Sequence, residues 1–188
     1  MRVNPVGSTI SLDRYGNVVD VSGSLAERYT FLGVVWRLSL RRTALSGAGI
    51  YATLSFTTPD SGLILLASAN VEKTGNEVEF DLIEGGTYEG GTIEEAVNPN
   101  RHAVSTYSLV SPLVDSYYGV SPTATLTGGI NIGSYLLTGE SQGNIKPGGA
   151  SAMEPYILSK STRYTLVMTA LGATTVESRA LMAYLSSA

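Results

Sequence analysis

The chain contains few side chains that could carry out chemistry. Of its 188 residues one is a histidine and none is a cysteine, so cysteine nucleophiles, thiolate metal sites and disulfides are excluded. A Ser-His-Asp triad would have to use His102, which follows Asn98-Pro99-Asn100-Arg101, and no serine lies in a nucleophile-elbow sequence. We therefore expect a protein that is not an enzyme, with His102 in a surface or interface loop.

Acidic residues gather in one glycine-rich stretch, at Glu84, Glu89, Glu94 and Glu95. Paired carboxylates can perform glycoside hydrolysis, and their oxygens suit calcium. The stretch lacks the alternating Asp and Asn ligands of calcium loops, so we predict a solvated loop without a metal or cofactor. The segment Gly47 to Ala52 formally matches a dinucleotide fingerprint, but it precedes a predicted strand instead of opening a helix, and we interpret it as a turn.

Composition narrows the class of protein further. Charged residues make up 15% of the chain and glycine contributes 21 residues, a balance typical of β proteins with many turns. The net charge is −4 and the basic residues are scattered apart from Arg41-Arg42, which argues against a nucleic-acid partner. The longest apolar runs, Phe31 to Trp36 and Leu63 to Ala67, are too short to cross a membrane. Since Pro5 and Gly7 precede any apolar run, we also expect no secretion leader.

Alternation of apolar and polar residues predicts half-buried β-strands. It is clearest in residues 29–41, 77–83 and 163–170, where the expected buried sets are Trp36, Leu38 and Leu40, then Val78, Phe80 and Leu82, then Tyr164, Leu166 and Met168. Further strands are expected at 8–12, 18–21, 49–58, 63–69, 121–130, 132–138, 156–159 and 175–185. Residues 1–22 are expected to form an N-terminal arm or β-hairpin that turns at Tyr15-Gly16-Asn17, and residues 23–188 a single β-sandwich domain.

Turn residues predict how these strands are joined. Pro59-Asp60-Ser61-Gly62 has a type I turn signature and predicts that 49–58 and 63–69 form a hairpin. Glu84 to Gly91, the polar run to Arg101, and Gly139 to Ala152 are predicted loops. The apolar spacing of Val176 to Leu185 fits a helix almost as well as a strand, and we favour the strand. The predicted fold is an all-β antiparallel sandwich or jelly-roll with an N-terminal hairpin.

Tyrosine is unusually frequent, with 11 residues. The pair Tyr117-Tyr118, next to Gly119, and the region around Tyr107 could stack on sugar rings. Tyrosine also suits contacts between protein subunits, because it offers a large contact area with a polar tip. Composition leaves both interpretations open.

From about Ile50 onward, the order of motifs resembles a group of small structural proteins from tailed-bacteriophage virions. Their pattern is a Thr-Pro-Asp turn, an apolar strand, a Tyr-Glu-Gly loop with Gly-Thr, an Asn-x-Asn-Arg segment and an Ile-Leu-x-x-x-Thr-x-Tyr block. The matching segments here are Thr58-Pro59-Asp60, Leu63 to Ala69, Tyr88-Glu89-Gly90-Gly91-Thr92, Asn98-Pro99-Asn100-Arg101 and Ile157 to Tyr164. The N-terminal part does not match, and Tyr184-Leu185-Ser186 replaces the family's closing aromatic-acidic segment.

The resemblance implies a capsid decoration, or cement, protein that sits as a homotrimer on the outer head shell. Its partner would be the major capsid protein or another virion protein, and it would be made in the cytoplasm of the host bacterium. Alternatives are a tail, collar or fibre component of the virion, or a carbohydrate-binding β-sandwich module. The residues expected at an interface are Tyr15, Asn17, Tyr88, Asn100, Arg101, Tyr117, Tyr118 and Lys146.

Overall fold

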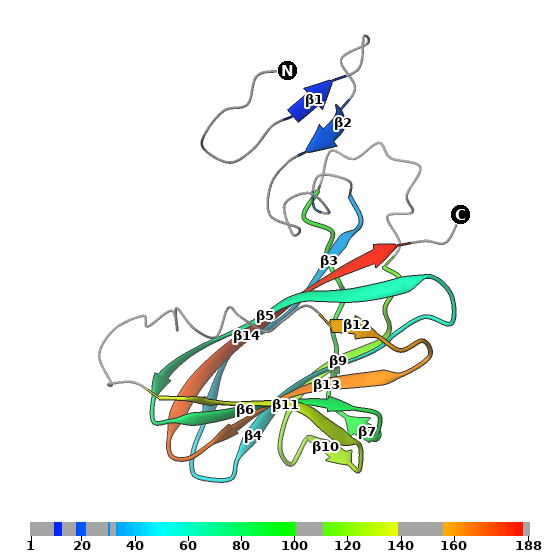
Figure 1. The fold of residues 1–188 in the computed structure, drawn as a ribbon. Helices are drawn as coiled ribbons and strands as arrows, with labels where there is room; N and C mark the ends of the chain where they lie inside the picture. The colour runs from blue at the N-terminus through cyan, green and yellow to red at the C-terminus, as the bar shows by residue number, and fades with distance from the viewer. Residues whose placement is uncertain are drawn as a thin grey trace.

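The described elements of the protein are all β-strands (Figure 1). The computed structural model describes residues 10–12, 18–21, 30, 33–100, 111–138 and 156–185. The strands are β1 (Ile10–Leu12), β2 (Val18–Val21), β3 (Val35–Leu45), β4 (Tyr51–Thr57), β5 (Leu63–Gly75), β6 (Val78–Glu84), β7 (Thr87–Gly90), β8 (Thr92–Ile93), β9 (Val114–Val120), β10 (Ala124–Thr127), β11 (Ile130–Leu137), β12 (Tyr156–Leu158), β13 (Arg163–Ala170) and β14 (Thr174–Leu185).

Two antiparallel sheets pack face to face. The larger has six strands in the order β11-β6-β13-β4-β9-β8, and the smaller has four in the order β12-β5-β14-β3. Two short pairs, β1-β2 and β10-β7, form separate two-stranded sheets. The predicted antiparallel β-sandwich with an N-terminal hairpin is therefore confirmed, and β1 and β2 pair from Ile10 opposite Val21 to Leu12 opposite Val18.

The core lies between the two main sheets, and period-2 alternation fills it as predicted. Leu38 and Leu40 in β3, Phe80 and Leu82 in β6, and Leu166 in β13 belong to one continuous buried cluster. Trp36 is also buried, with its ring edge-on to Tyr184 at a centroid distance of 6.3 Å. Burial of these side chains, at about 1.5–3 kcal/mol each, is the main force that holds the sheets together.

The C-terminal segment is a strand and not the alternative helix. β14 pairs with β3 on one side and with β5 on the other, with partners from Thr174 to Leu185 on β5. Its inward positions carry mostly small side chains, Val176, Ser178 and Ala180, which allow the opposite sheet to approach closely. In its central position, β14 forms backbone hydrogen bonds with a strand on each side. This long-range pairing favours a strand over a helix, a choice that the local spacing of apolar residues left open.

The predicted hairpin between residues 49–58 and 63–69 is wrong, although the chain does bend at residues 60–62. β4 belongs to the six-stranded sheet and β5 to the four-stranded sheet, so the turn passes the chain from one layer to the other. Thr58 N–H donates to the carbonyl of Thr162 at 3.0 Å, and Thr162 N–H donates to the Thr58 hydroxyl at 3.0 Å. These bonds hold the end of β4 to the turn before β13 instead of to β5.

The prediction of a loop from Glu84 to Gly91 is also wrong in part, because this segment contains strand β7. β7 pairs with β10 from Thr87 opposite Thr127 to Gly90 opposite Ala124. Gly86 and Gly90 have φ values of 81° and 77°, the left-handed region that glycine adopts without strain. Glycines that indicated a flexible loop thus serve as the bends at either end of a short strand.

Candidate interaction surface

The β7-β10 ribbon lies against the outer face of the six-stranded sheet. Gly91 N–H donates to the Thr123 carbonyl at 2.8 Å, and the Tyr51 hydroxyl donates to the Ala124 carbonyl at 3.1 Å. A Cβ added at Gly119 would meet the Ala124 Cβ and lie 3.2 Å from the Gly91 Cα. The absence of a side chain at Gly119 therefore allows the ribbon to approach the sheet.

Tyr88 is the residue through which the ribbon contacts the sheet. Its hydroxyl shares a hydrogen bond of 2.9 Å with Thr53 of β4, which is fully buried. Its ring lies 6.1 Å from that of Tyr117, and the Arg163 guanidinium carbon sits 5.7 Å from its centroid. Burial raises the pKa of the Tyr88 phenol, partly offset by the Thr53 hydrogen bond and the charge of Arg163.

Arg163 of β13 is held by three groups at the same place. Its guanidinium donates to the Ser55 hydroxyl at 3.2 Å and to the Asp115 carbonyl at 3.3 Å, and lies 3.9 Å from the Asp115 carboxylate. Asp115 has a φ of 49° at a β-bulge, where Asp115 and Ser116 of β9 lie opposite the single residue Phe56 of β4. The bulge turns the Asp115 carboxylate toward Arg163.

Tyr117 and Tyr118 do not form one stacking platform. Tyr117 is paired with Ser55 on the outer face, whereas Tyr118 is paired with Leu54 and packs against the main core. Successive strand residues point to opposite faces, so a neighbouring pair cannot present both rings to one ligand. Both rings are half-buried, but only Tyr117 lies on the outer face of the sheet.

A hollow of about 420 Å³ opens beside Tyr117. Its lining combines one aromatic ring, three aliphatic side chains, two serines and three carboxylates, namely Ile93, Glu94, Glu95, Ala96, Ser111, Leu113, Asp115, Ser116 and Tyr117. Burial raises the pKa of Glu94, and a hydrogen bond from the Ser39 backbone and the charge of Arg41 lower it in part. The hollow is suited to a cationic side chain with an apolar stem, such as lysine or arginine from a partner protein.

The four glutamates that are close in sequence do not act together. Glu84 ends β6 and accepts a hydrogen bond of 2.6 Å from the Tyr164 hydroxyl, so the prediction of a solvated loop is wrong for this residue. Glu94 and Glu95 line the hollow, and Glu89 lies on β7. Among the residues that the structure describes, no group of three or more histidines or acidic residues could hold a metal ion.

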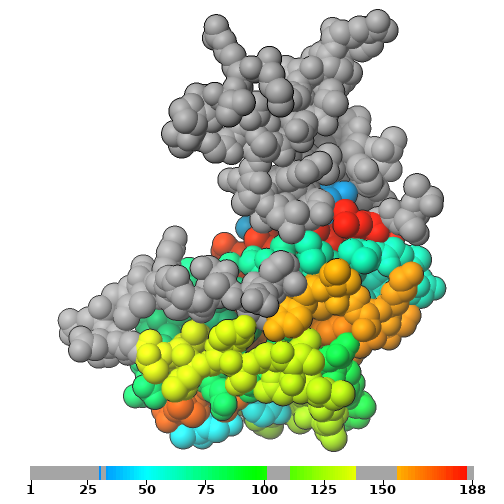
Figure 2. Space-filling view, viewed as in Figure 1, coloured from blue at the N-terminus to red at the C-terminus, as the bar shows by residue number. Residues whose placement is uncertain are grey.

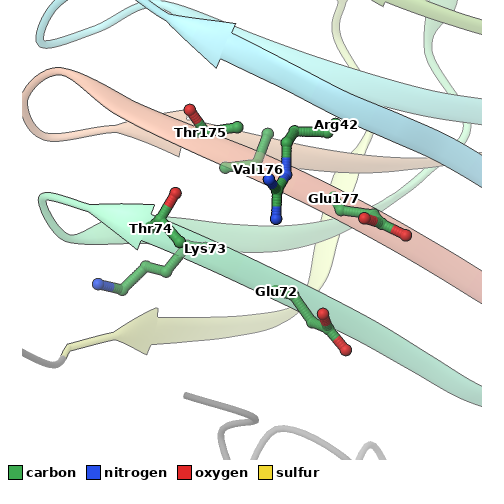
Figure 3. A pocket seen from close by; sticks show the side chains of 7 residues that line it. All are labelled: Arg42, Glu72, Lys73, Thr74, Thr175, Val176 and Glu177. Carbon is green, nitrogen blue, oxygen red and sulfur yellow. The ribbon is translucent and has the colours of Figure 1, made fainter. Parts of the chain in front are cut away.

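A second depression lies at one end of the four-stranded sheet, where Figure 3 shows Arg42 reaching over β14. Its accessible space is about 10 Å³, which is no more than one water molecule occupies. Glu177 lies directly opposite Glu72, and Arg42 shares this region with both. We interpret it as a charged surface, since it is too small for an organic ligand.

The predicted interface residues are only partly brought together. Tyr88 and Tyr117 contact each other, whereas Tyr118 packs against the core. Asn100 donates its backbone N–H to the Asn98 side chain at 2.9 Å. Tyr15, Asn17, Arg101 and Lys146 lie outside the described residues, as do His102, Tyr107 and the predicted loop Gly139 to Ala152.

Sequence reasoning missed two components of the surface, Arg163 and the polar pair Thr53 and Ser55. Alternation alone predicts that the outer face of the six-stranded sheet is exposed to solvent. Three hydroxyl residues on this face are nevertheless fully buried, namely Thr53, Ser55 and Thr165. The only available signal was that β4 carries small hydroxyl residues, and no charge, at its outward positions Thr53, Ser55 and Thr57.

No protein-family profile matches the chain, and no curated protein matches its sequence. Within the described ranges there is no helix long and apolar enough to span a membrane.

Proposed function

We propose that this chain is a structural protein of a tailed-bacteriophage virion, a decoration protein that binds the outer head shell and stabilises it. The observation that carries the proposal is that the polar side chains on the outer face bind other parts of the same chain. Arg163, Tyr88 and Thr53 are engaged in fixing the β7-β10 ribbon to the sheet, so they build a rigid surface instead of a reactive centre. The order of sequence motifs described above supports the virion assignment.

The hollow beside Tyr117 is the candidate contact with the shell. It presents Glu94, Glu95 and Asp115 around an aromatic wall, with Ile93 71% exposed at its rim. An exposed aliphatic residue next to carboxylates suits a basic residue of a capsid subunit, whose stem packs on Ile93 while its charge pairs with an acid. Such an interface requires shape and charge but no catalysis.

Co-sedimentation with head shells assembled from the cognate major capsid protein tests the proposal. We expect saturable binding at a fixed ratio of copies and a raised melting temperature of the shell. Glu94→Gln with Glu95→Gln should weaken binding about tenfold, equivalent to about 1.4 kcal/mol. Glu72→Gln with Glu177→Gln removes the same charge from the four-stranded sheet and should leave binding unchanged. Absence of shell binding by the unaltered protein would contradict the proposal.

One observation favours a carbohydrate-binding module as a second candidate. Tyr117 stands beside three carboxylates, and an aromatic face with hydrogen-bond acceptors also suits a sugar ring. Saturable binding to a glycan array that is lost in Tyr117→Ala and retained in Tyr118→Ala would support this candidate over shell binding.

A further inference from the structure

Among the strands that the structure describes, the two strands of the N-terminal hairpin pair only with each other. β1 and β2 form a sheet of their own, and Figure 1 shows them beyond the end of β3, away from β11. Five of the seven residues in these strands are aliphatic, namely Ile10, Leu12, Val18, Val19 and Val21. An isolated two-stranded hairpin is at best marginally stable in water. The hairpin therefore needs a third strand from elsewhere.

β11 offers such a strand position. It pairs with β6 along one side, and its other side forms the edge of the six-stranded sheet. Its sequence, Ile-Asn-Ile-Gly-Ser-Tyr-Leu-Leu, contains neither the charges nor the proline that usually protect an edge. Ile130 and Leu136 are 68% and 56% exposed, and Figure 2 shows β11 in yellow on the surface turned to the viewer.

The other sheet edges are less open in the described part of the chain. β12 and β8 contain three and two residues, too few to template a long pairing. β3 is bridged at Arg37, whose backbone exchanges hydrogen bonds of 2.8 and 2.9 Å with Val97. The bulge of β11 lies between Asn131 and Gly133, so residues 133–137 remain regular and are long enough for the four residues of β2.

The connection to the sandwich allows the hairpin to reach a neighbour. The 12 residues from 22 to 33 separate it from Val34. Thr30 to Gly33 form a turn, with Gly33 N–H donating to the Thr30 carbonyl at 3.0 Å. Fully extended, the eight residues from 22 to 29 would span about 27 Å, which exceeds the radius of a domain of this size. Donor and acceptor are different surfaces of the same chain, so the contact is head-to-tail and closes into a ring when the rotation permits.

We infer that the β1-β2 hairpin of one copy adds to the outer edge of β11 in a second copy, where no described strand pairs, and so extends its six-stranded sheet to eight strands. The contact itself does not require a head shell. Only its role in the virion rests on the proposed function. Copies of this chain would then recognise each other through a largely aliphatic donor hairpin, with Asp20 as its one charged strand residue, and an uncharged acceptor edge.

Thiol cross-linking tests the exchange without background, since the chain contains no cysteine. Full-length Ser11→Cys and Ser134→Cys proteins are mixed and treated with a short bismaleimide. We expect a dimer band in the mixture that neither protein gives alone, and a ladder up to the size of the ring from the double variant. A mixture of Ser11→Cys with Glu72→Cys, exposed on the other sheet, should give no band.

Three outcomes would overturn the inference: no cross-link between positions 11 and 134, a cross-link that forms only within one chain of the double variant, or equal cross-linking to Glu72→Cys.

Native mass measurement supplies an independent check. Leu136→Lys on β11 should weaken self-association at least tenfold, whereas Leu171→Lys, 47% exposed in the β13-β14 turn, should not. Ser134→Lys repeats the test should Leu136→Lys fail to fold, and equal self-association of the charged and control variants contradicts the exchange.

Shell co-sedimentation of the same variants separates this inference from the proposed function. Exchange without shell binding contradicts only the virion role. Shell binding by a protein that shows no exchange contradicts only the pairing of the hairpin with β11.

Discussion

Tyr164 links the core to the surface network at the scale of single residues. The residue is 1% exposed, and its ring stacks on Phe56 at a centroid distance of 5.9 Å. Its hydroxyl donates to Glu84 at 2.6 Å and accepts the Ser159 backbone N–H at 2.8 Å. Ser159 follows β12 of the four-stranded sheet, and Glu84 ends β6 of the six-stranded sheet. The phenol of Tyr164 therefore connects the two sheets next to the turn before β13.

Tyr164 should make the stability of the fold depend on alkaline pH. Burial raises the pKa of its phenol, and the hydrogen bond to Glu84 raises it further. Because the folded-state pKa lies above the unfolded value of about 10, the stabilisation is complete below pH 10 and is lost as pH rises through the folded-state pKa. Tyr164→Phe should cost about 1.5–3 kcal/mol at pH 8 and reduce the loss of stability above pH 10.

Urea unfolding of both proteins between pH 8 and pH 11 measures this effect. Tyr135→Phe, a half-buried tyrosine on the edge strand β11, is the matched control. A loss of stability above pH 10 that is the same in Tyr164→Phe as in the unaltered protein would show that Tyr164 is not its source.

At the scale of elements, the placement of the ribbon depends on how closely β10 approaches β9. Ala124 is fully buried, and Gly119 provides the space that its methyl group occupies. The ribbon in turn covers Thr53, whose hydroxyl is held by Tyr88 and also donates to the Gly119 carbonyl at 3.4 Å. Loss of the close approach should therefore expose polar groups that the fold has buried.

Gly119→Ala should displace the ribbon and destabilise the protein by about 1–3 kcal/mol, the usual effect of overpacking a filled site. Ala124→Gly removes the methyl group that the new Cβ would meet. The double variant should therefore be more stable than Gly119→Ala alone, which chemical denaturation of the three proteins would reveal. Additive losses in the double variant would show that these two positions do not limit the approach.

Elements whose two faces differ in polarity were predictable from sequence, and those defined by long-range pairing were not. Trp36, Leu38 and Leu40 predicted the buried face of β3 correctly, because alternation reports burial directly. The turn at Pro59 was equally clear, yet a turn fixes only the reversal of the chain. Whether β4 and β5 then pair or separate depends on Thr162, more than 100 positions away in the chain.

The interaction surface was less predictable for the same reason. Tyr88 and Tyr117 were identified as interface residues, and the structure brings them together. Tyr118 was predicted with them because it is adjacent to Tyr117 in the sequence, but the alternation of β9 directs its side chain to the core. Arg163 was missed because its role depends on the bulge at Asp115, and a bulge has no local signature without a glycine at that position.

At the scale of the whole molecule, two parts differ in what stabilises them. The sandwich has a continuous core that includes Phe56, Leu82 and Met168. The hairpin comprises three residue pairs, and no third strand joins it among the described residues. The division into residues 1–22 and 23–188 remains a prediction, and it implies that the hairpin gains order mainly through assembly.

Hydrogen exchange on the intact chain tests this division without any truncation. In dilute solution the amides of β1 and β2 should exchange at least a hundredfold faster than those of the central strands β4 and β13, which open only when the whole sandwich unfolds. At concentrations that favour assembly, protection should rise together in the hairpin and along β11, because each supplies hydrogen-bond partners to the other. β14, central in the four-stranded sheet, should be equally protected at both concentrations. If the hairpin were as protected as β4 in the dilute monomer, its stability would come from its own chain, and the boundary near residue 22 would be incorrect.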